Sequence, residues 1–507
     1  MTLTVVPSMS SPDNAPLRKR AVRAVAWGYG GSVARMAVQI LAQAVLARLL
    51  GPEEFGVFAA LMLLIGVSVL AADLVSAPVI QMPVLEAAAL RFACAVQWMG
   101  SGVVALLSLV SLPLFMDAFP QVGGLGASLA MVALGIFVTG CGGVSLSLLR
   151  RELRYREIQL AQLGGYVVGY VVVAVPLALA GQHTHHVLVI AWLVQSVVTT
   201  ALQYRWARHP LAASFGFQGW RRFVRYGGEV SVGNVANWLS MSIDRLLIAR
   251  SAPAVDIGYY NTMLNLMSTP VHQVSTSLNT VAFSVSAQSG EAALRRGTVI
   301  YLHASTLLFG MLYGVFAAAP HFWVGLIYGP RWIDGAVYLT PFCVAAVGFG
   351  LAAAANAVLT SGGRAGASAV SQVATAVLIA AVVASLVQDS AVWAAWGVAA
   401  VYLLRALALG WLSLRRVGAG GRVLVKVVIV PLLFVAAQVA CARALVASLA
   451  GMTLAPALAD IIGVAGGLAV VIVPHFLFRT MLLPQPSQEW LAALWHKLNR
   501  RRERPTS

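Results

Sequence analysis

Long apolar runs, separated by short polar or basic segments, repeat along almost the whole chain. A helix needs about 20 residues to cross the bilayer core, and fourteen runs reach that length. They fall near residues 24–50, 55–81, 92–116, 124–148, 159–180, 186–204, 227–249, 257–286, 298–324, 336–359, 366–388, 391–414, 427–447 and 456–478. They are rich in Leu, Ala, Val and Gly and lack the alternation of a membrane barrel. The pattern predicts an all-α polytopic membrane protein with about 14 transmembrane helices.

Composition supports this prediction. The 507 residues are 60% hydrophobic and only 10% charged, which excludes an ordinary water-soluble fold. The four cysteines all lie inside apolar runs without metal-ligand spacing, so we interpret them as small core residues. His183, His185 and His186 cluster in a short loop with no carboxylate or cysteine nearby in the sequence, and no metal site is predicted.

The basic residues indicate a topology. The formal net charge is +17, and 27 of the 34 Lys and Arg lie on alternate loops and tails between the apolar runs. Because cytoplasmic loops carry the excess of basic residues, both termini and the polar stretch 205–226 are predicted to be cytoplasmic. The charge is therefore mainly a topology signal, and no motif supports a nucleic-acid partner.

An internal repeat divides the chain. A shift of 202 residues superposes the first apolar helix on the seventh, with nine identities in the 37 positions from 20 to 56. An offset of six helices preserves orientation, so the chain is predicted to hold two parallel six-helix repeats plus two C-terminal helices. The predicted segments are an N-terminal cytoplasmic stretch 1–23, an N-lobe 24–204, a linker 205–226, a C-lobe 227–414, two further helices in 415–478 and a basic tail 479–507.

The tail has two interpretations. Trp490, Leu491, Leu494, Trp495 and Leu498 fall on one helical face and are followed by basic residues. This pattern is typical of an amphipathic helix lying on the anionic cytoplasmic leaflet. A basic tail that only fixes topology fits equally well.

Polar stripes interrupt two of the predicted spans. Residues spaced three or four apart form one stripe on each helix: Ser32, Arg35, Gln39 and Gln43 on the first, and Asn234, Asn237, Met241, Asp244 and Arg245 on the seventh. Polar groups are costly against lipid, so the stripes predict a hydrated cavity between the halves.

Several charged or titratable residues in the spans leave alternatives open. Arg35 and Asp73 lie at similar depth, so they either form a structural ion pair or offer a guanidinium to a substrate phosphate. Arg48 and Arg250 end their helices near the outer interface, where a structural, snorkelling role is favoured. His272 is either a proton-coupling group or, more often for a lone membrane histidine, a structural hydrogen-bonding residue.

No catalytic set or cofactor motif emerges, so transport is the preferred class and no cofactor is expected. The candidate substrate-binding residues are Arg35, Gln39, Gln43, Asp73, Asn234, Asn237, Asp244, Arg245 and His272, with Arg48 and Arg250 as outer-interface basic candidates.

Particular strings then become informative. LARLLGPEEFGVFAALMLLIG at 46–66, RRELRYREIQLAQLGGYVVGYVVVAVPLALAG at 150–181 and DRLLIARSAPAVDIGYYNTMLNLMSTP at 244–270 occur in this order. They resemble polysaccharide-repeat flippases, the Wzx-type branch of the MOP superfamily, as do LVSAPVIQMPVLE at 74–86 and LIYGPRWIDGAVYLTPF at 326–342.

The resemblance implies export of an undecaprenyl-pyrophosphate-linked oligosaccharide, by alternating access, from the cytoplasmic to the periplasmic leaflet of a bacterial inner membrane. It implies a lipid-linked oligosaccharide and the bilayer as partners, with the polysaccharide polymerase and chain-length machinery as further candidates. Arg35 and Arg245 are the leading anion contacts, with Asp73 and Asp244 as orienting or ion-coupling groups. Proton or sodium coupling stays open. The alternatives are a lipid II flippase, a MATE-type drug or cation antiporter and, more remotely, a membrane glycosyltransferase or polymerase.

Overall fold

The computed structural model describes residues 15–67, 69–82, 85–118, 125–286, 291–361, 365–449 and 456–477. Within these ranges the chain is helical, and it forms two compact units, unit 1 with residues 1–242 and unit 2 with residues 243–507. The predicted basic tail and its amphipathic segment lie outside the described residues. The domain boundaries predicted from the sequence stay predictions.

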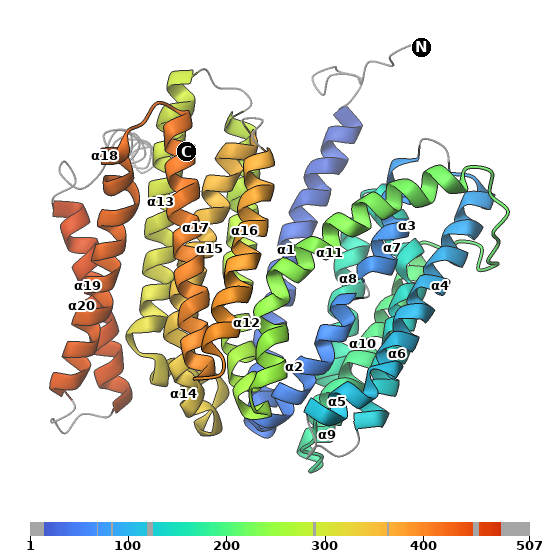
Figure 1. Ribbon diagram of the computed structural model, residues 1–507, viewed down its shortest axis with the longest axis horizontal. Helices are drawn as coiled ribbons and strands as arrows, with labels where there is room; N and C mark the ends of the chain where they lie inside the picture. The colour runs from blue at the N-terminus through green and yellow to red at the C-terminus, as the bar shows by residue number, and fades with distance from the viewer. Residues whose placement is uncertain are drawn as a thin grey trace, which may run out of the picture. The chain divides into compact units, whose positions relative to one another are not determined.

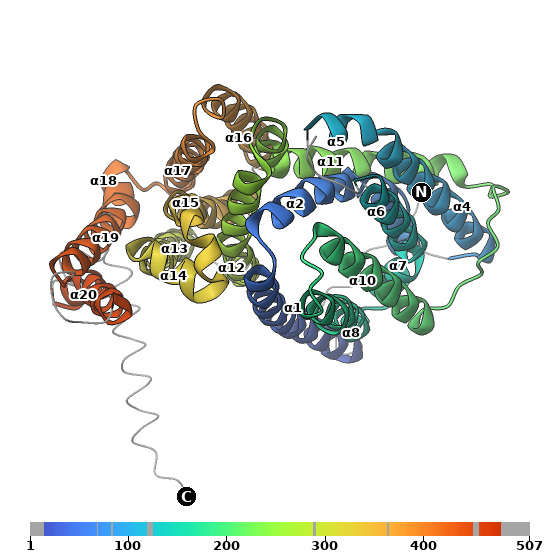
Figure 2. The same cartoon turned by 90° about the horizontal axis from the view of Figure 1, so that it is seen from below.

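In unit 1, the axes of most helices are roughly aligned with one another (Figure 1). The described helices of this unit are α1 (Ala15–Leu49), α2 (Pro52–Val67), α3 (Val69–Gln81), α4 (Ala87–Val110), α5 (Leu112–Ala118), α6 (Leu125–Cys141), α7 (Gly143–Arg151), α8 (Tyr155–Tyr166), the π-helix η2 (Val167–Ala174), α9 (Val175–Leu179), α10 (His185–Trp206) and most of α11 (Trp220–Ser251). In Figure 2, α8 lies between α1 and α10, and it contacts both.

Unit 2 contains the end of α11 and the remaining helices. These are α12 (Ala254–Ser286), α13 (Glu291–Ala318), α14 (Pro320–Tyr328), the 3-10 helix η3 (Pro330–Gly335), α15 (Ala336–Ser361), α16 (Ala365–Leu386), α17 (Ala391–Arg416), α18 (Gly421–Leu424), the π-helix η4 (Val425–Ile429), α19 (Val430–Leu449) and α20 (Pro456–Leu477). Helix α15 forms the centre, because it packs on α12, α13 and α17.

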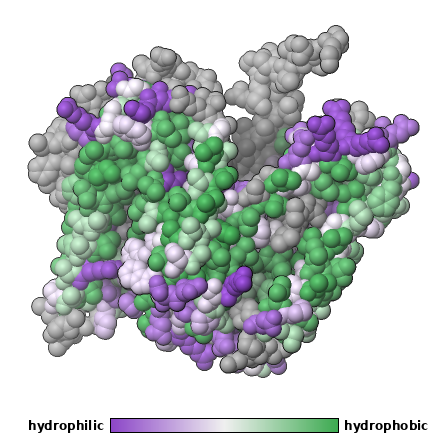
Figure 3. Space-filling model, viewed as in Figure 1, coloured by the Kyte–Doolittle hydropathy of each residue, from purple (hydrophilic) through white to green (hydrophobic). Residues whose placement is uncertain are grey.

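Membrane insertion follows from the length and surface of these helices. By length and composition, ten helices in the described ranges can cross a membrane, and a shorter apolar helix covers Pro456–Ile472. Hydrophobic residues cover the middle of each unit, and hydrophilic residues gather toward the ends (Figure 3). The all-α membrane fold is therefore confirmed, while the count of fourteen spans stays a prediction.

The four remaining predicted spans are helical but less regular. The run 55–81 is divided between α2 and α3, while α11, which carries the second polar stripe, and α12 are not among the ten apolar spans. The internal repeat predicted from the sequence agrees with the junction between α1 and α2. Helix α1 ends at Leu49 and α2 begins at Pro52, and a shift of 202 residues gives the observed end of α11, Ser251, and start of α12, Ala254.

Close helix packing depends on small residues, as expected for membrane helices. Gly348 on α15 faces the backbone of α17, where an added Cβ would lie 2.8 Å from the amide nitrogen of Leu403. Gly169 in η2 likewise faces the carbonyl oxygen of Ala191 on α10. Two of the four cysteines, Cys94 and Cys343, are buried, and all four are free thiols, in agreement with the core interpretation.

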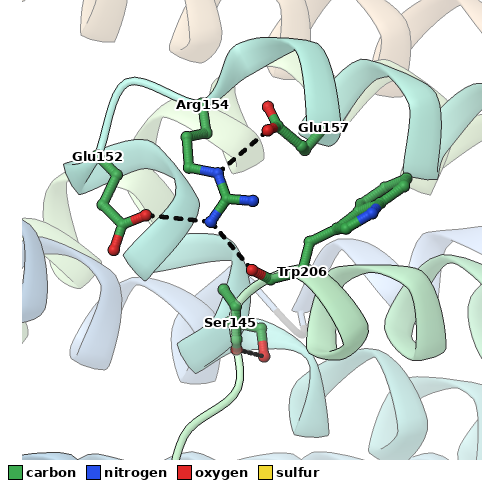
Figure 4. Close-up of polar contacts among 6 residues, drawn as sticks. Ser145, Glu152, Arg154, Glu157 and Trp206 are labelled. Atoms are coloured by element: carbon green, nitrogen blue, oxygen red, sulfur yellow. Dashed lines mark hydrogen bonds and ion pairs between the residues drawn. The ribbon is translucent and has the colours of Figure 1, made fainter.

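A polar network joins α7, α8 and α10 at the end predicted to be cytoplasmic (Figure 4). The Arg154 guanidinium donates to Glu152 (3.2 Å), Glu157 (3.1 Å) and the carbonyl oxygen of Trp206 (3.0 Å). Burial acts to lower the pKa of Arg154, but the two carboxylates outweigh it and raise the pKa. In the sequence, Arg154 indicates only topology. In the structure it also caps the C-terminal end of α10, because it donates to the carbonyl oxygen of Trp206.

The linker between α10 and α11 covers 207–219 and packs on α4. The ring of Phe217 contacts Phe92 and Phe223, and His209 Nδ1 lies 3.3 Å from Cys94 Sγ. At the opposite end of unit 1, His185 Nδ1 lies 3.1 Å from Glu54 Oε2. The histidine cluster thus gains a carboxylate that sequence proximity did not reveal, but within the described residues no three metal-binding side chains gather.

Candidate functional site

The first polar stripe is held against α8. Ser32 Oγ accepts a hydrogen bond from Gln159 Nε2 (3.3 Å), and the carbonyl oxygen of Gln39 accepts one from Tyr166 Oη (3.5 Å). Arg35 donates to Gln162 Oε1. We call these residues the unit 1 cluster: Ser32, Arg35, Gln39, Gln159, Gln162 and Tyr166.

The constant spacing of these contacts explains the stripe. Each pairs residues 127 apart, so α1 and α8 run in the same direction with matched helical repeats. The helices approach closely at Gly31, where an added Cβ would lie 2.6 Å from Gln159 Cβ. Two parallel helices begin on the same side of a membrane, which agrees with the predicted topology.

Arg35 is half-buried, and its described hydrogen bond goes to a neutral amide. The side chain of Asp73, on α3, lies outside the described part of the chain, so the Arg35–Asp73 pair stays a prediction. A guanidinium bonded to an amide keeps its full positive charge. Arg35 therefore brings a positive charge into the membrane-spanning part of unit 1.

A second cluster lies in unit 2, between α11, α12 and α17. Asp244 is buried and accepts a hydrogen bond from Tyr260 Oη (2.9 Å), while Arg245 Nη2 donates to Asn265 Oδ1 (3.2 Å). Tyr402 interacts electrostatically with Asp244, Arg245 and a further guanidinium, Arg405. We call these residues the unit 2 cluster: Asp244, Arg245, Tyr260, Asn265, Tyr402 and Arg405.

The sequence indicates why adjacent residues take different partners. Asp244 and Arg245 are about 100° apart around α11, so they cannot pair face to face. The structure gives each its own partner on α12, Tyr260 and Asn265. The carboxylate is thus held by a hydroxyl, and the neighbouring guanidinium remains a local positive charge.

Aromatic side chains enclose this cluster. Tyr260 packs edge-on against Phe342, with ring centroids 4.8 Å apart. Phe349, also on α15, contacts the His272 ring at 4.3 Å and the Tyr402 ring at 5.9 Å. Charges in such apolar surroundings interact more strongly than charges in water.

Spare hydrogen-bond donors are the most informative feature of the unit 2 cluster. The Nε atoms of Arg245 and Arg405 are buried and have no hydrogen-bond partner among the described residues. A buried polar group without a partner costs free energy, so such donors favour an anionic ligand. Guanidinium groups suit phosphate because their donors form a planar fork.

The remaining predicted residues are more accessible. Asn234, Asn237 and His272 are exposed, as are Arg48 and Arg250 at the ends of their helices, while Gln43 is half-buried on α1. The predicted site residues did not include Arg405, although a basic residue inside the apolar run 391–414 was a usable signal.

The fold is similar to the folds of solved transporters. The chain aligns over 91% of its length with 99% of a lipid II flippase MurJ in an inward closed conformation, with TM-score 0.68 and 12% identity. It aligns over 75% of its length with 93% of an inward-facing multidrug resistance MATE transporter of the MOP superfamily, with TM-score 0.51 and 15% identity. The fold of the chain is therefore similar to the folds of the MurJ flippase and of this MATE transporter.

The sequence comparison defines the family. A family model described as "Polysaccharide biosynthesis protein" matches residues 45–337, more than half of the chain. The chain belongs to this family, and the resemblance found in the sequence is confirmed.

Curated relatives are more distant. The succinoglycan biosynthesis transport protein ExoT of Rhizobium meliloti (strain 1021) is 25% identical over 324 residues, 62% of this chain and 64% of ExoT. The lipopolysaccharide biosynthesis protein WzxC of Escherichia coli (strain K12) is 20% identical over 341 residues, 65% of this chain and 67% of WzxC. The match to ExoT thus spans less than two thirds of that relative's length. Family and neighbours are named as biosynthesis, transport or flippase proteins, in agreement with the expected absence of enzymatic function.

Proposed function

We propose that this protein is a flippase that moves a lipid-linked oligosaccharide across the bacterial inner membrane by alternating access. Membership of the polysaccharide biosynthesis family and the names of its relatives support this cargo. The observation that carries the proposal is a pair of half-buried arginines, Arg245 and Arg405, whose buried Nε atoms have no hydrogen-bond partner among the described residues.

The chemistry fits an anionic lipid carrier. Moving a pyrophosphate headgroup through hydrocarbon is prohibitive without groups that replace its hydration. Two guanidinium groups supply such donors, while Tyr260 holds Asp244 and, in the described part of the chain, Arg245 has no bidentate carboxylate partner. We assign Arg245 and Arg405 as pyrophosphate contacts and Arg35 as a second cationic contact in unit 1. The remaining predicted residues stay candidates for sugar contacts, and the coupling ion stays open.

The test is flipping in proteoliposomes that contain the full chain and a fluorescent lipid-linked oligosaccharide. Arg245→Gln removes the fork and is expected to slow flipping about tenfold or more, the effect of one charge-assisted hydrogen bond. Arg245→Lys keeps the charge and is expected to retain more activity. The exposed Arg295 on α13 provides the matched control R295Q.

Two outcomes oppose the proposal. Absence of flipping by the wild-type protein, although it is folded and correctly inserted, would contradict transport of this cargo. Faster flipping of lipid II than of the oligosaccharide carrier would reassign the cargo to peptidoglycan.

We also propose that both termini face the cytoplasm, and that a polysaccharide polymerase and its chain-length machinery act on the product. The excess of basic residues in alternate loops supports this orientation. Reporter fusions at either terminus test it, since a periplasmic terminus would invert the direction assigned to export.

A further inference from the structure

A groove on unit 2, separate from both clusters, joins two cavities. One carries charged side chains on a mostly apolar wall and is called the polar cavity, and the other is apolar throughout most of its lining. The polar cavity has a volume of about 600 Å³ and is lined in part by Arg443, Asp460 and His321. The apolar cavity, about 620 Å³, is lined mainly by apolar residues of α13, α15, α17 and α19. Thr340, Trp396 and Arg443 line both cavities, so they form one continuous groove.

The polar end lies where the helices of unit 2 terminate. Asp460 is in the first turns of α20, Ala318 ends α13, and Trp396 is near the start of α17. Trp396 is 39% exposed, as expected of a tryptophan at the level of lipid headgroups. The charge pattern assigns this end to the periplasm, opposite the basic end of α17 at Arg415 and Arg416.

The length of the groove matches one leaflet. Its apolar part runs along α19 from Arg443 to Leu432, which is about 16 Å at 1.5 Å per residue. Half of a roughly 30 Å hydrocarbon core is about 15 Å. An acyl chain whose headgroup lies at the polar cavity would therefore extend along Leu432, Val435 and Val439 to the middle of the bilayer.

Two hydrogen bonds from one nitrogen hold the Arg443 guanidinium in place and leave its other N–H donors available. Its Nη2 donates to the carbonyl oxygen of Ala317 (2.9 Å) and to Thr340 Oγ1 (3.0 Å). A guanidinium has five N–H donors, and the hydrogen bonds of Arg443 among the described residues use only Nη2, which leaves Nη1 and Nε available. They are suited to a phosphate at the mouth of the groove.

Asp460 makes the polar cavity selective. It interacts electrostatically with His321, and it places a carboxylate in the same cavity as the Arg443 guanidinium. A purely anionic lipid would offer this carboxylate no cationic group, whereas a zwitterionic headgroup offers a phosphate to Arg443 and an ammonium to Asp460. A primary ammonium donates hydrogen bonds to a carboxylate, but a quaternary ammonium does not.

We propose that this groove binds a phospholipid of the phosphatidylethanolamine class from the outer leaflet, as a structural lipid distinct from the transported cargo. The phosphate binds Arg443, the ammonium binds Asp460, and one acyl chain fills the apolar cavity. This lipid site depends on the predicted topology but not on the proposed function.

The experiment compares lipid binding to the full-length protein by native mass spectrometry, using phosphatidylethanolamine, phosphatidylcholine and phosphatidylglycerol of equal chain length. The wild-type protein is expected to bind phosphatidylethanolamine about tenfold more tightly than phosphatidylcholine, as one charge-assisted hydrogen bond predicts. D460N is expected to reduce this preference to less than about twofold, since the carboxylate is lost. R443Q is expected to weaken binding of both zwitterionic lipids about tenfold, and R443K to weaken it less.

Matched controls use exposed residues at the same end of unit 2. D389N and R331Q alter a carboxylate and a guanidinium outside the groove, and lipid preference is expected to be unchanged. R443K also shows whether a loss in R443Q reflects misfolding. Equal wild-type binding of the three lipids, or preference for phosphatidylglycerol, would overturn the proposal. Displacement of phosphatidylethanolamine by a stoichiometric amount of polyprenyl phosphate would overturn it too, by assigning the groove to the cargo's lipid tail.

Discussion

The unit 1 and unit 2 clusters both place arginine inside the membrane, but their surroundings differ. In unit 1, Arg35 lies in a seam where α1 and α8 approach at Gly31, and it bonds to the amide of Gln162. In unit 2, Arg245 and Arg405 lie among aromatic rings and retain donors without a described partner. The seam fixes its cation by packing, whereas the unit 2 cluster keeps hydrogen-bonding capacity for a ligand. A buried arginine therefore signals function most clearly when its donors are unsatisfied.

The largest expected effect is on the flipping rate, and it tests directly whether the unit 2 cluster contributes more than the unit 1 cluster. The double variant R245Q/R405Q removes two charge-assisted contacts and is expected to slow flipping by at least about 100-fold, because each is worth about 1.5–3 kcal/mol. R35Q is expected to slow flipping by less than about tenfold. Proteoliposome flipping rates, normalised to inserted protein, measure both. A larger loss in R35Q than in the double variant would reverse the assignment of the two clusters.

The next largest effect is on protein stability, and it comes from a hydrogen bond in the unit 2 cluster. Y260F deletes the hydroxyl that binds Asp244 and leaves a buried carboxylate without its side-chain donor. We expect a loss of about 1.5–3 kcal/mol in stability, the range for a bond to a charged group. Thermal unfolding in detergent measures it against Y338F, whose hydroxyl bonds to the half-buried Asp256 (3.1 Å). Equal destabilisation by both variants would show that the cluster is no more sensitive than its periphery.

Packing in the unit 1 seam provides the third test. G31A places a Cβ 2.6 Å from Gln159 Cβ, so we expect destabilisation of about 1–3 kcal/mol from overpacking. The neighbouring glycine is the control, since an added Cβ at Gly30 meets nothing within 4 Å. G30A is expected to be neutral or slightly stabilising, because alanine favours helix. If both variants unfold at the same temperature, the seam is not closely packed.

The sequence predicted much of this fold because apolar length and basic loops report directly on a membrane. Within the described ranges, each of the fourteen apolar runs falls on helical structure, and the 202-residue offset agrees with the α1–α2 and α11–α12 junctions. The interruptions were not predicted. Breaks such as that at Ser111, between α4 and α5, and the π-helix η2 depend on packing between helices, which periodicity does not report.

The candidate site was predicted less completely. The stripe through Ser32, Arg35 and Gln39 was visible from its spacing, but its partners on α8 lie 127 residues away and could not be paired from one sequence. Arg405 was passed over because a single basic residue in an apolar run has the same appearance whether or not its donors are satisfied. The difference between the clusters is thus a property of tertiary contacts.

The smallest expected effect concerns His209, in the linker of unit 1 outside the membrane-spanning helices. Burial lowers the pKa of His209 from its ordinary value of 6.5, although its contact with the carbonyl oxygen of Pro210 acts in the opposite direction. The folded state therefore binds the proton more weakly than the unfolded state. The stabilising contribution is complete above about pH 6.5 and is lost as the pH falls through the folded pKa.

Hydrogen exchange over residues 207–219 measures this effect and separates it from changes in the seam. Exchange is expected to increase on going from about pH 7.5 to about pH 5, after correction for intrinsic rates, and H209N is expected to reduce the increase. H183N, at an exposed residue in the opposite loop of unit 1, is the control. If H209N leaves the pH dependence unchanged, the linker is not held by a neutral imidazole.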